Sequence, residues 1–269
     1  MSDNNDNLRS DLPSNAFFFM HVSKTAGSYV NETLRTALGN RFLDHCEEPG
    51  RLATTAPVSL RSGHIILSRW LEVEQQRGWS PRRFTLIRDP IKQLASHILW
   101  LDHYNLPQFF EERDMFKEPT QHVIKTIGST NLSDPEELDR FLTDLDAIGL
   151  RYFDNNQARY FVDGFEGIGS DRPLHLGMRD QALQAVEYFA AIGINDDLPG
   201  FINMLSRELG IPLLTPDQLI NKAAAVRTID IKDPLVKRAL KRRLSLDLWL
   251  YDTVYEKWEK SIYSLNKDN

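Results

Sequence analysis

Residues 24–28 place a lysine, two hydroxyls and small side chains just after an apolar run, Phe17–Val22. An amphipathic helical pattern follows at once. The N–H groups of a first helical turn have no partners inside the helix, and the helix dipole favours negative charge there. Lys24 adds a point charge, and the hydroxyls of Thr25 and Ser28 add donors. This spacing predicts a binding site for a phosphate or sulfate group.

The loop is not a Walker A sequence, which requires G-x-x-x-x-G-K-[ST] to hold a triphosphate and magnesium. Here Lys24 and Thr25 precede Gly27, and no such glycine spacing leads into them. The shorter loop is suited to one anionic group at a helix N-terminus. From the loop alone, a surface lysine in an ordinary strand–helix turn stays an alternative.

A second pattern suited to an anion lies in residues 84–97, FTLIRDPIKQLASH. It puts Arg88 at the end of an apolar run and Ser96 about two helical turns later. Arginine offers a two-pronged donor to a phosphate, and a nearby serine hydroxyl can complete the grip. For Arg88 alone, the alternative is a pair with Asp89 or with a neighbouring helix end.

These residues need a scaffold that brings strand ends together. Alternating strands and helices indicate a parallel sheet with right-handed crossovers, in which ligands bind beyond the carboxyl ends of the strands. Lys24 and Arg88 both fall there. We therefore expect an α/β, P-loop-like three-layer fold with a central, mostly parallel sheet flanked by helices. The expected strands are Phe17–Val22, Gly63–Leu67, Phe84–Arg88 and Tyr188–Ile194.

The remaining segments predict one domain with an insert. Residues 102–160 are expected to be a helical insert, with a capping box from Ser133 to Glu136. Residues 1–15 are polar, lack a signal-peptide core and predict a disordered tail. Residues 16–269 are expected to form a single domain that closes with one or two amphipathic helices after Asp233.

Composition limits the partners. The 269 residues carry a net charge of −6, so long-range attraction to nucleic acid or an anionic membrane is not expected. Cys46 is the single cysteine, which excludes an intrachain disulfide and a cysteine-based zinc site. No apolar run approaches the ~18–20 residues that span a bilayer. A cytoplasmic protein fits these features, and the sequence carries no signal for an oligomeric state.

Together the two anion-binding patterns resemble the sulfotransferases that use 3′-phosphoadenosine 5′-phosphosulfate (PAPS), in the branch that includes the heparan 2-O-sulfotransferases and many bacterial proteins. Those enzymes carry H-x-P-K-T-G-G-T after the first strand and R-D-P-x(5)-S-H after a later one. This chain reads HVSKTAGS from His21 to Ser28, then RDP from Arg88 and SH from Ser96.

Four further segments extend the resemblance over roughly residues 16–258. They are similar to the family's G-H-x-x-F, N-x-Q-x-R, V-G-L-x-E and D-x-x-L-Y-D patterns, and they begin here at Gly63, Asn156, Ile192 and Asp247.

The chain departs from the family's loop at three positions, Ser23, Ala26 and Ser28, where the family has proline, glycine and threonine. Ser28 keeps the hydroxyl, whereas Ala26 requires a backbone conformation open to a residue with a Cβ. The acidic member of V-G-L-x-E is displaced, with Asp196 and Asp197 near the expected position.

The resemblance implies that this loop binds the donor's 5′-phosphosulfate, and that Arg88 and Ser96 bind its 3′-phosphate. Lys24 would balance charge on the leaving phosphate and the transferring sulfuryl group, and no metal is required. The product would be 3′-phosphoadenosine 5′-phosphate (PAP). The residues implied for the 5′ site are Lys24, Thr25, Ala26, Gly27, Ser28 and Tyr29.

His64 is the expected general base, because a histidine has a pKa near working pH and a histidine near this motif is the proposed base in the related enzymes. A structural histidine at a strand edge is the alternative. His21 is expected to support the loop. The carboxylates Asp44, Glu47 and Glu48 also stay open as bases.

The acceptor is the less defined partner. The insert is expected to cover the acceptor side, and the resemblance favours a carbohydrate hydroxyl, with a small-molecule alcohol as the alternative. The residues expected to line the acceptor or cofactor cleft are Gln157, Arg159, Asn221 and Lys222. A small-molecule kinase of P-loop type and a non-catalytic PAP-binding protein are the competing functions.

Overall fold

The computed structural model describes residues 12–265 apart from 53, 166–168, 170 and 215–226, with side chains as far as residue 260. Five strands form one sheet in the order β2-β3-β1-β4-β5. Every neighbouring pair is parallel, so the expected α/β fold with a helix-flanked central sheet is confirmed. The strands are β1 (Phe17–Met20), β2 (Phe42–Leu43), β3 (Leu60–Gly63), β4 (Arg82–Ile87) and β5 (Ala191–Ile194).

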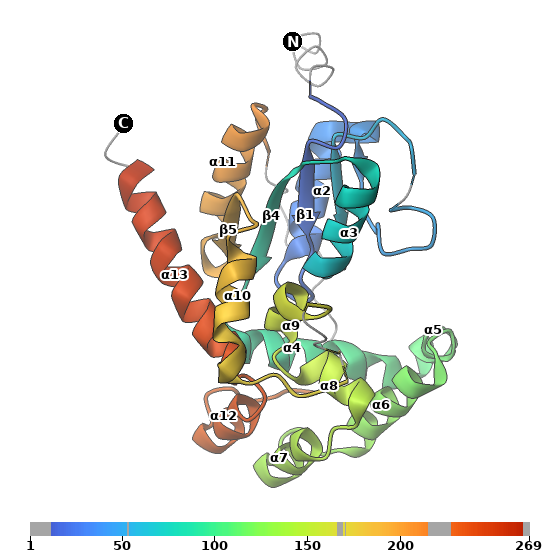
Figure 1. The fold of residues 1–269 in the computed structure, drawn as a ribbon. Coiled ribbons are helices and arrows are strands. Elements are labelled where there is room, and N and C mark those ends of the chain that lie inside the picture. Colours follow the sequence, from blue (N-terminus) through green and yellow to red (C-terminus); the bar gives the residue numbers. More distant parts are fainter. Residues whose placement is uncertain (1–11, 53, 166–168, 170, 215–226, 266–269) are drawn as a thin grey trace.

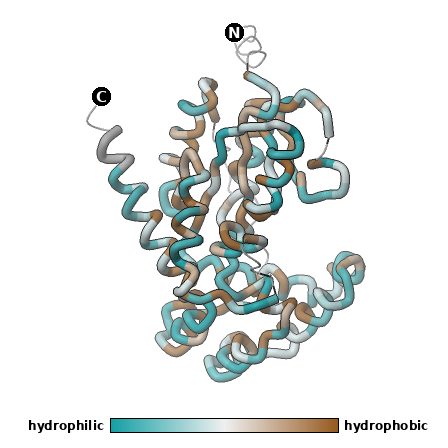
Figure 2. Tube along the Cα trace, in the orientation of Figure 1, coloured by the Kyte–Doolittle hydropathy of each residue, from teal (hydrophilic) through white to brown (hydrophobic). Residues whose placement is uncertain are grey.

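The central strand β1 is buried on both faces, and its alternating side chains pack into different helical layers. The Phe18 ring stacks on Trp70 of α3 (Leu67–Arg77) with centroids 3.7 Å apart. The Phe19 ring lies 6.2 Å from Phe201 of α11 (Leu198–Leu209). The central strands are correspondingly hydrophobic in Figure 2. The sheet is therefore the middle of three layers.

Crossover direction separates the first two helices. The chain leaves β1 through α2 (Gly27–Leu38) to reach β2 and then β3, and it returns from β3 past β1 to β4 through α3. Right-handed crossovers in opposite directions put these helices on opposite faces (Figure 1). Both β1 and β4 thus end at the same edge, and their following loops are neighbours.

Strand boundaries differ from the sequence prediction. The expected strand 63–67 is wrong, because β3 ends at Gly63 and His64 follows the strand instead of opening it. The hydrophobic pattern does not reveal β3, because two of its four residues are polar. Arg61 and Ser62 are buried, and they donate to Asn15 Oδ1 at 3.0 Å and to Asn31 Oδ1 at 2.8 Å. The other strands lie within the predicted ranges or shift by a few residues, and β2 was not predicted.

The segment from β4 to β5 is helical, as expected for the insert, and it carries a second hydrophobic core. That core also takes Val236, Ala239 and Leu240 from α12 (Pro234–Lys241), far along the chain. The first elements of this segment are α4 (Pro90–Asp102), η2 (His103–Asn105), η3 (Pro107–Phe109) and α5 (Phe110–Asp114). Then come α6 (Glu118–Ser129), α7 (Pro135–Thr143), α8 (Ala147–Phe153), α9 (Asn156–Val162), η4 (Leu176–Met178) and α10 (Arg179–Val186).

Two local predictions are corrected. The N-cap of α7 is Asp134, not Ser133, because its carboxylate accepts the N–H groups of Glu136 and Glu137 and Pro135 fills the first helical position. Of the predicted disordered tail, residues 12–15 are bound: the Asn15 N–H donates to the Val58 carbonyl at 2.7 Å. Residues 1–11 lie outside the described residues. Within the described ranges, no helix is long and apolar enough to cross a membrane.

The N-termini of α9 and α13 (Ser245–Leu265) cap each other. Asp247 accepts the N–H groups of Gln157 at 3.2 Å and Ala158 at 2.7 Å. In return, Asn155 Oδ1 accepts the N–H groups of Leu246 at 2.7 Å and Asp247 at 3.0 Å. All four bonds are buried, so this exchange fixes α9 beneath the carboxyl edge of the sheet.

Asp247→Ala leaves two buried N–H groups of α9 without acceptors. We expect the free energy of unfolding, measured in urea, to fall by about 2–4 kcal/mol. Asp252→Ala, an exposed position on the same helix, is the matched control and should change stability by less than about 0.5 kcal/mol. Equal effects of the two substitutions would contradict the capping role.

Candidate functional site

The loop between β1 and α2 has an unusual backbone. Lys24 and Ala26 both adopt positive φ, 63° and 73°, on either side of Thr25. Ala26 is also the N-cap of α2 in the left-handed region. Left-handed residues within a turn are typical of backbone nests that bind anions. The sequence led us to expect at Ala26 a backbone conformation open to a residue with a Cβ, whereas Ala26 adopts the left-handed region, which glycine adopts more easily.

Four consecutive carbonyls of this loop, those of residues 22–25, accept hydrogen bonds from side chains. The donors come from the loop itself, from α4, from the residue after β4 and from the residue after β5. The bonds are Thr25 Oγ1 to Val22 O (2.8 Å), Gln93 Nε2 to Ser23 O (2.9 Å), Arg88 Nη1 to Lys24 O (3.1 Å) and Asn195 Nδ2 to Thr25 O (3.1 Å). The carbonyl side of the loop is thus held by the protein.

The amide side is left available. In a trans peptide the N–H of one residue points opposite to the carbonyl of the residue before it. No cis peptide bond occurs among the described residues. Across the part of the chain that the structure describes, the N–H groups of residues 25–28 have no protein acceptor, whereas the Tyr29 N–H bonds to Ala26 O. The loop therefore presents the N–H groups of residues 25–28 as available donors at the start of α2. Tyr29, which the sequence led us to include in the 5′ site, does not contribute its N–H.

Lys24 and Arg88 bring two cations to this edge. Burial, and then the charge of Arg88, lower the pKa of Lys24. Among the described residues, the hydrogen bond recorded for the Arg88 guanidinium goes to the Lys24 carbonyl and not to a carboxylate. The Nε of Arg88 is buried and has no hydrogen-bond partner there. Paired cations with free donors favour an anionic ligand.

Gln157 fixes the main chain of Arg88. Its Oε1 accepts the Arg88 N–H at 2.9 Å, and its Nε2 donates to the Arg88 carbonyl at 2.8 Å. The side chain is 2% exposed, and the Asp247 cap holds its own N–H. Gln157 was expected to line a cleft. The geometry makes it a positioning residue for Arg88 instead.

His64 has a defined tautomer. Its Nδ1 lies 2.7 Å from the carbonyl oxygen of His21, which can only accept, so Nδ1 carries the proton. Nε2 of the neutral ring is then the acceptor. Burial is the main cause that lowers the pKa of His64, against a smaller opposing effect of Glu47. A neutral imidazole whose Nε2 has no hydrogen-bond partner among the described residues is suited to accept a proton.

The alternative carboxylate bases are engaged elsewhere. Glu47 Oε2 accepts the backbone N–H of His64 at 3.0 Å. Burial alone would raise the pKa of Glu47, but hydrogen bonds from its own N–H, from His45 and from His64 lower it overall, which makes it a weaker base. Asp44 and Glu48 both pair with Arg51. These contacts favour His64.

His21 and Gly27 pack against each other, as expected for a histidine that supports the loop. A Cβ on Gly27 would come within 2.0 Å of the His21 ring. The Thr25 hydroxyl differs from expectation: it is buried and donates to Val22 O, so it shapes the loop from within. Ser28 and Ser96 are both half-buried.

Two expected cleft residues have other outcomes. Arg159 is 3% exposed and pairs with Asp154 and Asp163, so it is an interior residue and the cleft prediction for it is wrong. Asn221 and Lys222 lie outside the described residues.

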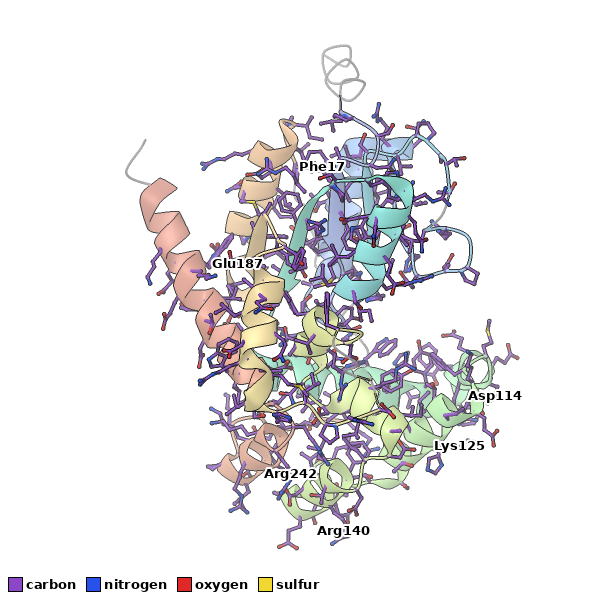
Figure 3. The ribbon with its side chains drawn as sticks, viewed as in Figure 1. Phe17, Asp114, Lys125, Arg140, Glu187 and Arg242 are labelled. Carbon is purple, nitrogen blue, oxygen red and sulfur yellow. The ribbon has the colours of Figure 1, made fainter. Side chains whose placement is uncertain are left out.

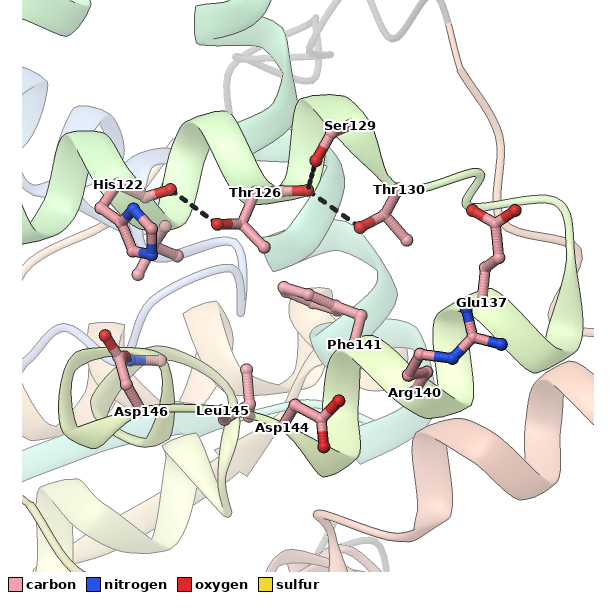
Figure 4. Close-up of a pocket in the computed structure, with 12 residues that line it drawn as sticks. His122, Thr126, Ser129, Thr130, Glu137, Arg140, Phe141, Asp144, Leu145 and Asp146 are labelled. Carbon is pink, nitrogen blue, oxygen red and sulfur yellow. Dashed lines mark hydrogen bonds between the residues drawn. The ribbon is translucent and has the colours of Figure 1, made fainter.

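A pocket of about 340 Å³ lies elsewhere, on the insert between α6, α7 and α8 (Figure 4). His122 and Thr126 line it from α6, and Arg140 and Phe141 from α7. It contains none of the predicted site residues. Among the described residues, no group of three or more histidine, cysteine or acidic side chains is arranged to hold a metal ion.

Sequence comparison assigns no family to this site. No protein-family model matches the chain, and no curated protein matches it significantly.

Ala26→Gly should stabilise the protein by about 0.5–1 kcal/mol, because the left-handed conformation costs a residue with Cβ about 1–2 kcal/mol and glycine's extra chain entropy offsets part of that gain. The urea midpoint measures the change. Ala37→Gly, inside α2, is the matched control and should destabilise by about 1 kcal/mol. Loss of stability in both variants would contradict the strain at Ala26.

Proposed function

We propose that this protein is a PAPS-dependent sulfotransferase that transfers a sulfuryl group to an acceptor hydroxyl in the cytoplasm. The observation that carries the proposal is the loop of residues 22–28. Side chains hold its carbonyls at residues 22–25, one of them through the bond from Arg88 to Lys24, and the N–H groups of residues 25–28 have no acceptor among the described residues. The sequence patterns around Lys24 and Arg88 support the same reading.

The residues present fit the donor. The free N–H groups of residues 25–28, with Lys24 and the Ser28 hydroxyl, would hold the 5′-phosphosulfate. Arg88, whose buried Nε has no protein partner among the described residues, would bind the 3′-phosphate with Ser96. PAPS supplies a sulfuryl group joined to its 5′-phosphate through an oxygen that leaves with PAP.

His64 would act on the acceptor. As the acceptor oxygen bonds to sulfur and the bond from sulfur to the phosphate oxygen breaks, Nε2 takes the hydroxyl proton. Lys24 would neutralise the charge that grows on the departing phosphate. The pKa of Lys24 is lowered by burial and by Arg88, but the ordinary pKa of a lysine from which it is lowered lies well above neutral pH.

PAP binding tests the proposal directly. Isothermal titration should show PAP binding in the micromolar range, and Arg88→Ala should weaken it at least tenfold, since a hydrogen bond to a charged group contributes about 1.5–3 kcal/mol. Binding of AMP, which lacks the 3′-phosphate, should weaken less than PAP binding in the same variant, because AMP is affected only through the lost bond from Arg88 Nη1 to the Lys24 carbonyl.

Arg82→Ala is the matched control, because Arg82 lies at the opposite end of β4 and is exposed. Failure of the wild-type protein to bind PAP would refute the proposal. Magnesium-dependent ATP consumption that PAP does not inhibit would favour the kinase alternative.

The pH profile tests His64. Because its pKa lies below the ordinary 6.5, the neutral base should persist through pH 7, and kcat/KM should decline only below about pH 6.5. His64→Gln should lower kcat about 10²–10⁴-fold and remove this acid limb. His45→Gln, on the exposed side of Glu47, should keep both rate and limb. An acid limb that survives in His64→Gln would show that another group is the base.

A further inference from the structure

Five aromatic side chains form a continuous surface that begins at Lys24. We call Trp100, His103, Tyr104, Phe109 and Phe116 the aromatic ladder. The Lys24 ammonium lies 5.8 Å from the centre of the Trp100 ring, within the range of a cation–π contact. The ladder thus starts at the residue that would meet the sulfuryl group.

The rings contact one another in sequence. Trp100 meets Tyr104 edge-on with centroids 5.7 Å apart, and Tyr104 meets Phe116 at 5.0 Å. His103 lies 3.9 Å from Tyr104 and 4.7 Å from Phe109. Edge-to-face contacts of this kind fix ring orientation. The ladder is therefore a preformed surface along the end of α4, η2 and η3, with Phe116 added from the turn between α5 and α6.

All five rings are half-buried, so each keeps an accessible part. Trp100, Tyr104 and Phe116 pack on the second core with one side. Phe109 contacts His103 and Tyr104 and, within the described chain, is not among the residues packed on either core. Packing in a hydrophobic core therefore does not explain why an aromatic residue stands at position 109, at the far end of the ladder.

The charge around the ladder limits what it can bind. Residues 103–118 hold four acidic side chains and two basic ones. Glu111, Glu112 and Asp114 are exposed on α5, and Asp114 marks its outer end in Figure 3. A polyanionic glycan would meet like charge along this segment.

We propose that the aromatic ladder binds the acceptor, and that the acceptor is an uncharged alcohol or phenol with an aromatic or extended apolar body. This inference rests on the proposed sulfotransferase function. The acceptor hydroxyl lies at the Lys24 end, loses its proton to His64 Nε2 and gains the sulfuryl group from PAPS, and PAP leaves. The apolar body extends over Trp100 and Tyr104 toward Phe109.

The test uses the full chain with PAPS and three probe acceptors: 2-naphthol, a neutral malto-oligosaccharide and unsulfated heparosan. Sulfated products are measured by mass spectrometry, and PAP binding is measured separately. We expect 2-naphthol to be sulfated with the highest kcat/KM and heparosan not to be sulfated. Phe109→Ala and Tyr104→Leu should raise the KM for 2-naphthol about tenfold without changing PAP affinity.

Phe110→Ala is the matched control: this neighbouring residue is 40% exposed, and its ring centre lies 4.3 Å from the guanidinium carbon of Arg113. PAP binding combined with preferred sulfation of either glycan, or with unchanged 2-naphthol KM in Phe109→Ala and Tyr104→Leu, would overturn this inference alone. Absence of PAP binding would overturn the proposed function, and the acceptor assignment with it.

Discussion

The candidate site depends on the fixation of four successive carbonyls in one loop. A carbonyl and the next N–H share a rigid plane, so anchoring one side of the peptide orients the other. Gln93, Arg88 and Asn195 reach the loop from three different elements, and their three bonds hold it in the left-handed turns at Lys24 and Ala26. The backbone strain is confined to Lys24 and Ala26, whereas the hydrogen bonds that maintain it come from several segments along the edge of the sheet.

The short helix α9 connects this loop to the rest of the protein. Through Gln157 it holds the main chain of Arg88, and through Tyr160 it reaches the Ser23 hydroxyl at 2.9 Å. Its own N-terminus relies on Asp247. Buried hydrogen bonds of this kind are costly to break, so the contacts made by Gln157, Tyr160 and Asp247 favour a single geometry of the loop.

Sequence alone predicted the fold class and the Lys24 loop, because apolar runs and small-residue punctuation carry those signals. It could not locate β3, whose Arg61 and Ser62 are buried among polar partners distant in the chain. Arg159 differs from these cases: its partners Asp154 and Asp163 lie only five residues before and four residues after it, so the i,i+4 spacing already offered an ion pair as the alternative to a ligand. The capping role of Asp247 likewise depends on a partner about 90 residues away, which local pattern cannot reveal.

The second core has a consequence for the order of folding. Its insert helices are contiguous in sequence, but α12, which packs against α7, follows about a hundred residues later. Closing so long a loop delays that contact. During synthesis the insert therefore leaves the ribosome with an uncovered apolar face, which persists until Val236, Ala239 and Leu240 emerge. Apolar surface exposed during this interval favours aggregation of the nascent chain.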